Sequence, residues 1–149
     1  MTDDPWNLAR FRAAQASGGA YDTALQELRA GRKRAHWVWF VLPQIAGLGH
    51  SPMAQRYAVS GLDEARGYLA DPELGPRLVD CAQTLTGLDE TDAVTVMGSV
   101  DAMKLRSCMT LFLHAATLAD HRAAFATVLD QFFGGQEDRE TLVRLDLNP

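Results

Sequence analysis

Cationic side chains gather in the first third of the chain, where they could bind an anion. The cluster consists of Arg29, Arg32, Lys33 and Arg34, and His36 follows it closely. Arginine offers a planar fork of donors and lysine a compact charge, and both suit phosphate or carboxylate groups. The dipole of a helix also favours cations at its C-terminus, by about 0.3–1 kcal/mol each. The cluster therefore fits an anion site and, equally, an ordinary solvated helix end.

Two tryptophans and a polar loop come directly after the cluster. Trp37 and Trp39 are two residues apart, so on a helix they point in different directions. We expect at least one of them in the core, while the other could form a pocket wall on which a base or sugar stacks. Gln44 and a loop with two glycines lead from there to Ser51, which resembles a helix cap. This segment could supply an amide and backbone donors to the same ligand.

A second polar block lies on a long apolar helix that we expect over 100–118. Asp101, Lys104, Ser107 and Thr110 recur every third residue along one face of it. This face could simply be solvated, with the two hydroxyl residues allowing close approach of another helix. Alternatively, it meets the segment 36–51 in one pocket for an anionic ligand.

The pocket hypothesis assigns ligand binding to one set of residues and catalysis to a smaller one. The ligand-binding candidates share a cationic, aromatic, amide or hydroxyl side chain. They are Lys33, His36, Trp39, Gln44, Ser51, Lys104 and Ser107. If the protein is an enzyme, His36 would be the general acid or base and Asp101 the carboxylate.

Metal and cofactor chemistry have little support in the sequence. The four histidines form no i, i+4 pair, and no cysteine stands at a ligand spacing from them, so we expect no metal and no cofactor. Fingerprints of phosphate-binding loops, dinucleotide folds and serine hydrolases are missing as well. Cys81 and Cys108 lie in apolar helical patterns and are expected to be buried, reduced thiols, which disfavours a Cys–His nucleophile.

Length and composition predict one helical domain. The chain has 149 residues, of which 47% are hydrophobic, so we expect a single domain over 1–149 with its core at about 5–133 and a short extension at 134–149. The net charge of −5 argues against a nucleic-acid or anionic-membrane partner. With neither a secretion signal nor a membrane-spanning window, the sequence predicts a cytoplasmic protein. Its oligomeric state stays open.

The helix signals predict an all-α fold, a compact orthogonal bundle of about seven to nine helices. Segment 36–42 could be a strand or a helix, and a helix is favoured because no second strand offers a partner. Expected caps are Asp4 with Pro5, Ser51, Ser99, Asp120, and a capping box from Ser60 to Asp63. The helices are expected at about 5–17, 20–30, 36–42, 52–58, 62–69, 72–86, 93–97, 100–118 and 121–133, with a short one near 142–145.

Two runs of residues resemble a known family. The first is Lys33-Arg34-x-His36-Trp37-x-Trp39-Phe40-x-x-Pro43-Gln44-x-x-Gly47-Leu48-Gly49, with Ser51 and Tyr57 after it. The second is Met97-Gly98-x-x-Asp101-x-x-Lys104-Leu105-x-Ser107-x-x-Thr110-Leu111-Phe112. Together they resemble a widespread bacterial domain of unknown function, some of whose members carry the label calpastatin-like. The resemblance extends from about Leu8 to Phe133. It implies a single, mainly α-helical domain and supplies no reaction, cofactor or catalytic residue.

Three functions are compatible with these patterns. The first is a binding domain for a small anionic ligand, such as a nucleotide or an ADP-ribose derivative. The second is a hydrolase that acts on a nucleotide-type substrate in the same pocket. The third is a protein-interaction module without a pocket, in which both motif blocks only build the core. The hypotheses are separated by whether His36, Gln44, Asp101 and Lys104 converge on one cleft.

Overall fold

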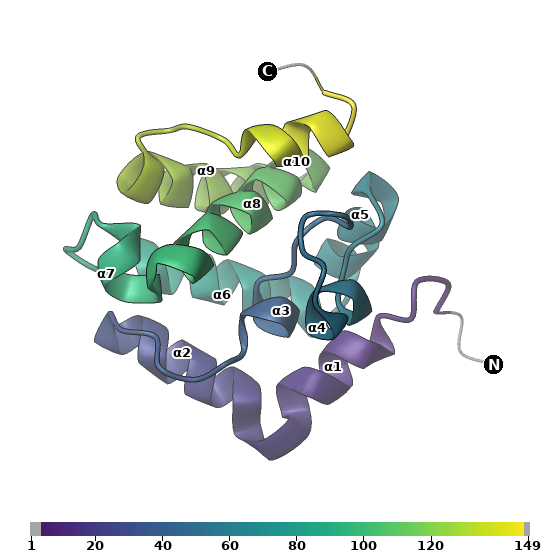
Figure 1. The fold of residues 1–149 in the computed structure, drawn as a ribbon, viewed down its shortest axis with the longest axis horizontal. Coiled ribbons are helices and arrows are strands. Elements are labelled where there is room, and N and C mark those ends of the chain that lie inside the picture. The colour runs from purple at the N-terminus through teal and green to yellow at the C-terminus, as the bar shows by residue number, and fades with distance from the viewer. Residues whose placement is uncertain (1–3, 148–149) are drawn as a thin grey trace.

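Helix α8 (Ser99–Ala115) is the longest element and lies at the centre of the molecule, in contact with α5, α7, α9 and α10. The structure is a computed structural model and describes residues 4–147. Figure 1 shows α1 and α2 joined in a V along one edge and α9 with α10 along the opposite edge. The predicted all-α multi-helix bundle is confirmed. The other elements are α1 (Ala9–Ala16), the 3-10 turn η1 (Ser17–Gly19), α2 (Ala20–Ala30), α3 (Val38–Val41), α4 (Pro52–Arg56), α5 (Leu62–Ala70), α6 (Leu74–Thr86), α7 (Ala93–Met97), α9 (Ala119–Phe133) and α10 (Arg139–Arg144).

The core is built around the apolar stripe of α8. Leu105, Cys108, Met109 and Phe112 are all fully buried on this helix. Large apolar side chains of α5, α6 and α9 pack against them, and the Phe112 ring lies 5.1 Å from the Tyr68 ring of α5. This confirms the expectation of a central helix that is buried on more than one side.

Several helix boundaries were predicted correctly because their signals are local. The Ser51 hydroxyl accepts a hydrogen bond from the Ala54 amide at 3.1 Å and caps α4. Gly31 ends α2 and Gly134 ends α9, both in the left-handed conformation that glycine adopts without strain. Segment 36–42 holds the short helix α3, as favoured.

Other predicted caps are wrong at the level of single residues. Ser99 is the first residue of α8 and makes no capping hydrogen bond, because the turn before it is made by Gly98 at φ 84°. Asp120 lies inside the first turn of α9 rather than before it. Helix α8 ends at Ala115, three residues earlier than expected, because Ala116 is already extended.

The first and fifth helices also begin differently from the prediction. Asp4 does accept hydrogen bonds from backbone amides, at 2.8 Å from Leu8 and 3.0 Å from Ala9, but the regular helix starts only at Ala9. The expected box between Ser60 and Asp63 is replaced by one bond, from the Ser60 amide to the Glu64 carboxylate at 2.9 Å.

One pairing was not predicted at all. Ile45 and Val59 form an isolated parallel bridge, in which the Ala46 amide donates to Val59 at 2.8 Å and the Val59 amide donates to Gln44 at 2.9 Å. The bridge fixes the loop after α3 against the chain that leaves α4. No helix in the described residues is long and apolar enough to cross a membrane.

Candidate functional site

The two lysines of the chain meet at one carboxylate. Lys33 Nζ lies 2.7 Å from Asp101 Oδ2, and Lys104 Nζ lies 3.4 Å from Asp101 Oδ1. Twelve arginines supply the other permanent side-chain cations, so both compact ammonium groups of this protein have been brought to the same point. Lys33 comes from the loop after α2, whereas Asp101 and Lys104 are one turn apart on α8. These three side chains together carry one net positive charge, which the Glu27 carboxylate near Lys33 partly offsets.

Glu27 at the end of α2 shapes the loop that delivers Lys33. Its Oε1 atom accepts hydrogen bonds from the amides of Arg34 and Ala35, at 2.8 and 3.0 Å, and from the indole of Trp37 at 2.8 Å. The Lys33 amide in turn donates to the carbonyl of Val96 at 2.7 Å, which ties the loop to α7. Sequence reasoning missed Glu27, although a lone carboxylate just before a run of cations is a signal that could have found it.

The pKa of Glu27 reports on this loop. Burial alone would raise it, but the hydrogen bonds from Ala35, Arg34 and Trp37, together with the charge of Lys33, hold the pKa below its ordinary value of 4.5. A carboxyl whose pKa is lower in the folded protein stabilises the fold above the unfolded-state pKa. That stability is lost as the pH falls through the folded-state pKa.

We therefore expect Glu27→Gln to make the free energy of unfolding depend less on pH below neutrality. Between about pH 6 and pH 3, the unfolding free energy of the wild type should fall more steeply than that of the variant. At neutral pH the variant should be less stable by about 1–2 kcal/mol, because a neutral amide is a weaker acceptor for three donors. Urea unfolding at each pH measures both effects, and the exposed Glu73→Gln is the control. Parallel profiles for wild type and Glu27→Gln would contradict this role.

The two tryptophans have separate roles. Trp37 is 2% exposed and belongs to the core, which confirms that at least one of the pair is structural. Trp39 is only partly buried, with Lys104 Nζ 4.9 Å from its ring centroid and the His36 ring 6.5 Å away. Trp39 and its two neighbours thus form a mixed aromatic and cationic surface beside the lysine cluster.

The rest of the basic cluster points elsewhere. Arg29, Arg32 and Arg34 are exposed, whereas the Lys33 side chain is 6% exposed. The interpretation of the arginines as a solvated helix end therefore holds for three of the four cations. Only the lysine turns inward, where it also donates to the carbonyl of Ala35 at 2.5 Å.

A cleft runs between α3 with its following loop and the first half of α8. We call it the α3–α8 cleft, and it consists of two adjoining hollows of about 340 and 300 Å³ that share Val100. A small third hollow joins them through Trp39 and Gln44. The first hollow is lined by Lys33, His36, Val38, Trp39, Met97 and residues 98–101. The second is lined by Gln44, Leu48, Gly49, Val100, Met103, Lys104, Ser107, Asp138 and Glu140.

All the predicted ligand-binding residues except Ser51 line this cleft, and both Ser51 and Ser107 have structural roles. Ser51 is exposed, caps α4 and does not line the cleft. Ser107 is 2% exposed and forms a hydrogen bond with Thr141 of α10 at 2.9 Å. Thr110 similarly accepts a hydrogen bond from the Asp138 amide at 2.8 Å. The polar stripe of α8 is thus divided, because its first half faces the cleft and its second half docks α10.

Asp101 is fully engaged by the lysines. Each of its oxygens lies near a different ammonium group, so the carboxylate organises two cations. Asp101 as the carboxylate of a catalytic pair with His36 stays a prediction. The thiols offer no alternative nucleophile: burial raises the pKa of Cys81 to about 12 and that of Cys108 well above its ordinary value. Among the described residues, no three His, Cys, Asp or Glu side chains are grouped as metal ligands.

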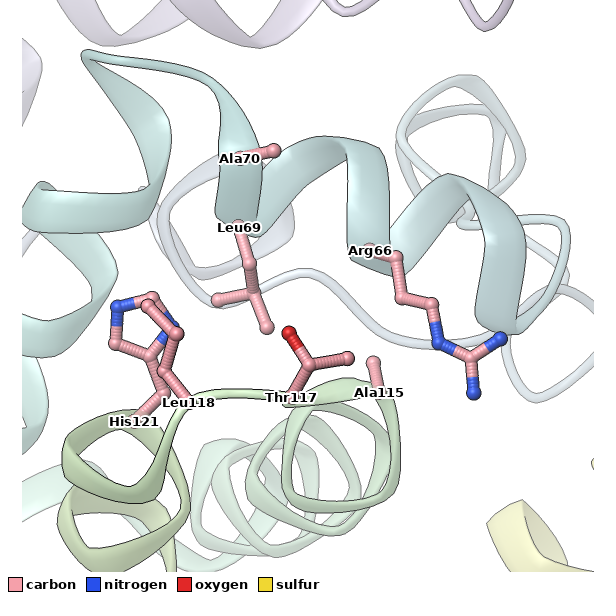
Figure 2. A pocket seen from close by; sticks show the side chains of 7 residues that line it. All are labelled: Arg66, Leu69, Ala70, Ala115, Thr117, Leu118 and His121. Atoms are coloured by element: carbon pink, nitrogen blue, oxygen red, sulfur yellow. The ribbon is translucent and has the colours of Figure 1, made fainter.

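Two hollows elsewhere in the described residues contain none of the predicted site residues. Figure 2 shows one of about 180 Å³ between α5 and the start of α9, with Arg66 at one end and His121 at the other. Leu69 and Leu118 line it between them, and the Thr117 hydroxyl points into it. A further hollow of about 300 Å³ contains His114, whose Nε2 lies 2.5 Å from Glu137. Arg122, Asp130 and Glu137 also line this further hollow, so it has charged groups of both signs, but it contains none of the residues that the sequence singled out.

The chain matches a protein family and a solved structure, neither of which has an assigned activity. The chain belongs to the DUF1810 family, described as protein of unknown function, whose model matches residues 5–145. It is also similar to a solved structure, the conserved hypothetical protein Rv1873 from Mycobacterium tuberculosis. The two share 44% sequence identity and superpose with a TM-score of 0.90 over 97% of this chain and 100% of the other. None of the curated proteins matches the chain. The family of unknown function expected from the motif blocks is therefore confirmed.

Proposed function

We propose that the protein binds a small anionic ligand in the α3–α8 cleft, with nucleotides and ADP-ribose derivatives as the leading candidates. The observation that carries the proposal is the convergence of Lys33, Asp101 and Lys104 from two distant segments. The excess positive charge of this cluster lies in a partly desolvated hollow, where it attracts an anion more strongly than an exposed cation does. The partly exposed Trp39 offers the same ligand an aromatic surface.

The two lysines have different tasks in this proposal. Lys33 is nearly buried and already has two partners, Asp101 and the carbonyl of Ala35. It therefore contributes positive charge to the cleft without contacting the ligand directly. Lys104 is 23% exposed and more loosely held by Asp101, which leaves ammonium protons for a ligand. His36 is exposed at the rim. The engaged state of Asp101 favours binding over hydrolysis, since each of its oxygens already lies beside an ammonium group and neither is left free to take a proton from a nucleophile.

Anion-dependent thermal stabilisation tests the proposal. Wild-type protein is heated with millimolar AMP, ADP, ADP-ribose or inorganic phosphate at constant ionic strength. A ligand present at 100 times its dissociation constant stabilises the folded state by about 2.7 kcal/mol, which is a shift of several degrees in Tm. We expect such a shift for at least one anion, and we expect Lys104→Gln to abolish most of it.

Arg29→Gln is the matched control. It removes the same charge from an exposed position outside the cleft and should leave the shift unchanged. Equal losses in the two variants would mean that the anion responds to overall charge. If no anion raised the Tm of the wild type, the proposed function would be wrong.

A further inference from the structure

We propose that the ligand has two unlike ends, an anionic group beside Lys104 and an apolar ring against Val100 and Met103. This inference rests on the proposed function and adds the chemical class of the ligand. The orientation of the ligand in the cleft also follows, because the second hollow exposes more apolar surface than the first. Lys33 and His36 line the first hollow, whereas the second combines Lys104 with apolar side chains and with two carboxylates.

The apolar side of the second hollow is built from side chains that are exposed to solvent. Val100 is 67% exposed and Met103 is 69% exposed, although both sit on the central helix of the fold. Leu48 faces them from the loop after α3 and lines the same hollow. Exposed apolar residues that line one concave hollow commonly mark a binding surface. Methionine in particular adapts to flat rings, because its thioether is flexible and polarizable.

The kind of ligand is inferred from the way in which the apolar surface adjoins the lysine cluster. Lys104 lines the second hollow together with Val100 and Met103, and Val100 also lines the first, so one ligand of moderate size can contact an ammonium group and the apolar side chains together. Gln44 lines the second hollow as well, and its amide offers a donor and an acceptor to the edge of a heteroaromatic ring. A ring joined to a phosphate or carboxylate fits this sequence of surfaces.

The far end of the cleft selects against a second anion. Asp138 and Glu140 line the second hollow, and Glu140 is exposed there. The Asp138 carboxylate caps α10 by accepting a hydrogen bond from the amide of Thr141 at 3.0 Å, so its position beside the hollow is fixed. Like charges that face each other without a cation between them are unfavourable. The ring end of the ligand should therefore be neutral or cationic.

Three simple probes test whether the ligand has one anionic end and one apolar end. Inorganic phosphate, phenyl phosphate and 4-carboxyphenyl phosphate are titrated by NMR or calorimetry at constant ionic strength. Phenyl phosphate should bind about tenfold more tightly than inorganic phosphate, because its ring is removed from water. The added carboxylate should cancel most of this gain.

Two variants locate the ring. Met103→Gln should lower the affinity for phenyl phosphate about fivefold and leave that for inorganic phosphate unchanged. Val94→Gln, a similarly exposed apolar position on α7 outside the second hollow, should change neither. Equal affinities for phosphate and phenyl phosphate would overturn the inference and leave the proposed function standing. Equal effects of the two variants would overturn it too. If no probe bound while a nucleotide still raised the Tm, the inference alone would be wrong, and if neither the probes nor the nucleotides bound, both would be wrong.

Discussion

Replacing Asp101 with asparagine is expected to lower the free energy of unfolding by about 3 kcal/mol, as measured by urea denaturation. The reason is the environment of Lys33, whose side chain is 6% exposed and lies 2.7 Å from the Asp101 carboxylate. An amide cannot neutralise this ammonium group, and a nearly buried cation without a counter-charge is strongly destabilising. The nearby Lys104 adds repulsion that the carboxylate no longer offsets.

A second substitution separates charge from packing. Lys33→Met in the Asp101→Asn background should recover most of the lost stability, because it removes the unpaired charge and keeps the apolar stem. Asp63→Asn serves as the matched control, since Asp63 is 84% exposed and its contact with Arg66 is long, at 3.6 Å. That variant should change stability by less than about 0.5 kcal/mol. Failure of Lys33→Met to rescue the Asp101 variant would show that Asp101 acts in some other way.

Gly75→Ala should be the most damaging single-methyl change in the fold. A Cβ atom at Gly75 would lie 2.1 Å from the backbone carbonyl oxygen of Leu69, where helices α5 and α6 touch. Because the obstacle is backbone rather than a flexible side chain, the two helices must move apart. We expect a loss of about 3 kcal/mol or more and a Tm that is lower by more than about 6 °C.

Gly87→Ala tests whether crowding is the cause. This glycine follows the last turn of α6 with φ −75°, and the nearest atoms to an added Cβ are at 3.5 Å. Alanine fits that backbone and reduces the freedom of the unfolded chain, so the variant should be neutral or slightly more stable. If both alanine variants lost the same stability, the contact between α5 and α6 would not explain the effect at Gly75.

The fold was predictable wherever one residue type dictates a local geometry. Glycines in the left-handed conformation ended α2 and α9 at the expected positions, and Ser51 capped the expected helix. Predictions failed where several residues compete for the same role. Ser99 and Asp120 both resemble caps, but each lies inside the first turn of its helix. The residue that precedes the first turn depends on how the helix packs, and the local sequence alone does not determine it.

Most residues of the candidate site could be predicted from the sequence, but the contacts between them could not. The periodicity of α8 placed Asp101 and Lys104 on one face, so their proximity follows from sequence. Their meeting with Lys33 depends on a loop whose path is set by Glu27 and by a hydrogen bond to α7. The position of Glu27 before the cations is a signal in the sequence, but the backbone bond to Val96 has none. The same limit applies to the bridge between Ile45 and Val59, which carries Gln44 to the cleft.

The scarcity of lysine has a practical consequence for chemical labelling. Reagents that acylate amines or form imines with them have only two side-chain targets in this chain. One of these, Lys33, is shielded by the fold, so Lys104 is the accessible side-chain amine. Among the side chains, a fluorophore or cross-linker directed at amines would therefore attach at the wall of the α3–α8 cleft without any engineered attachment point.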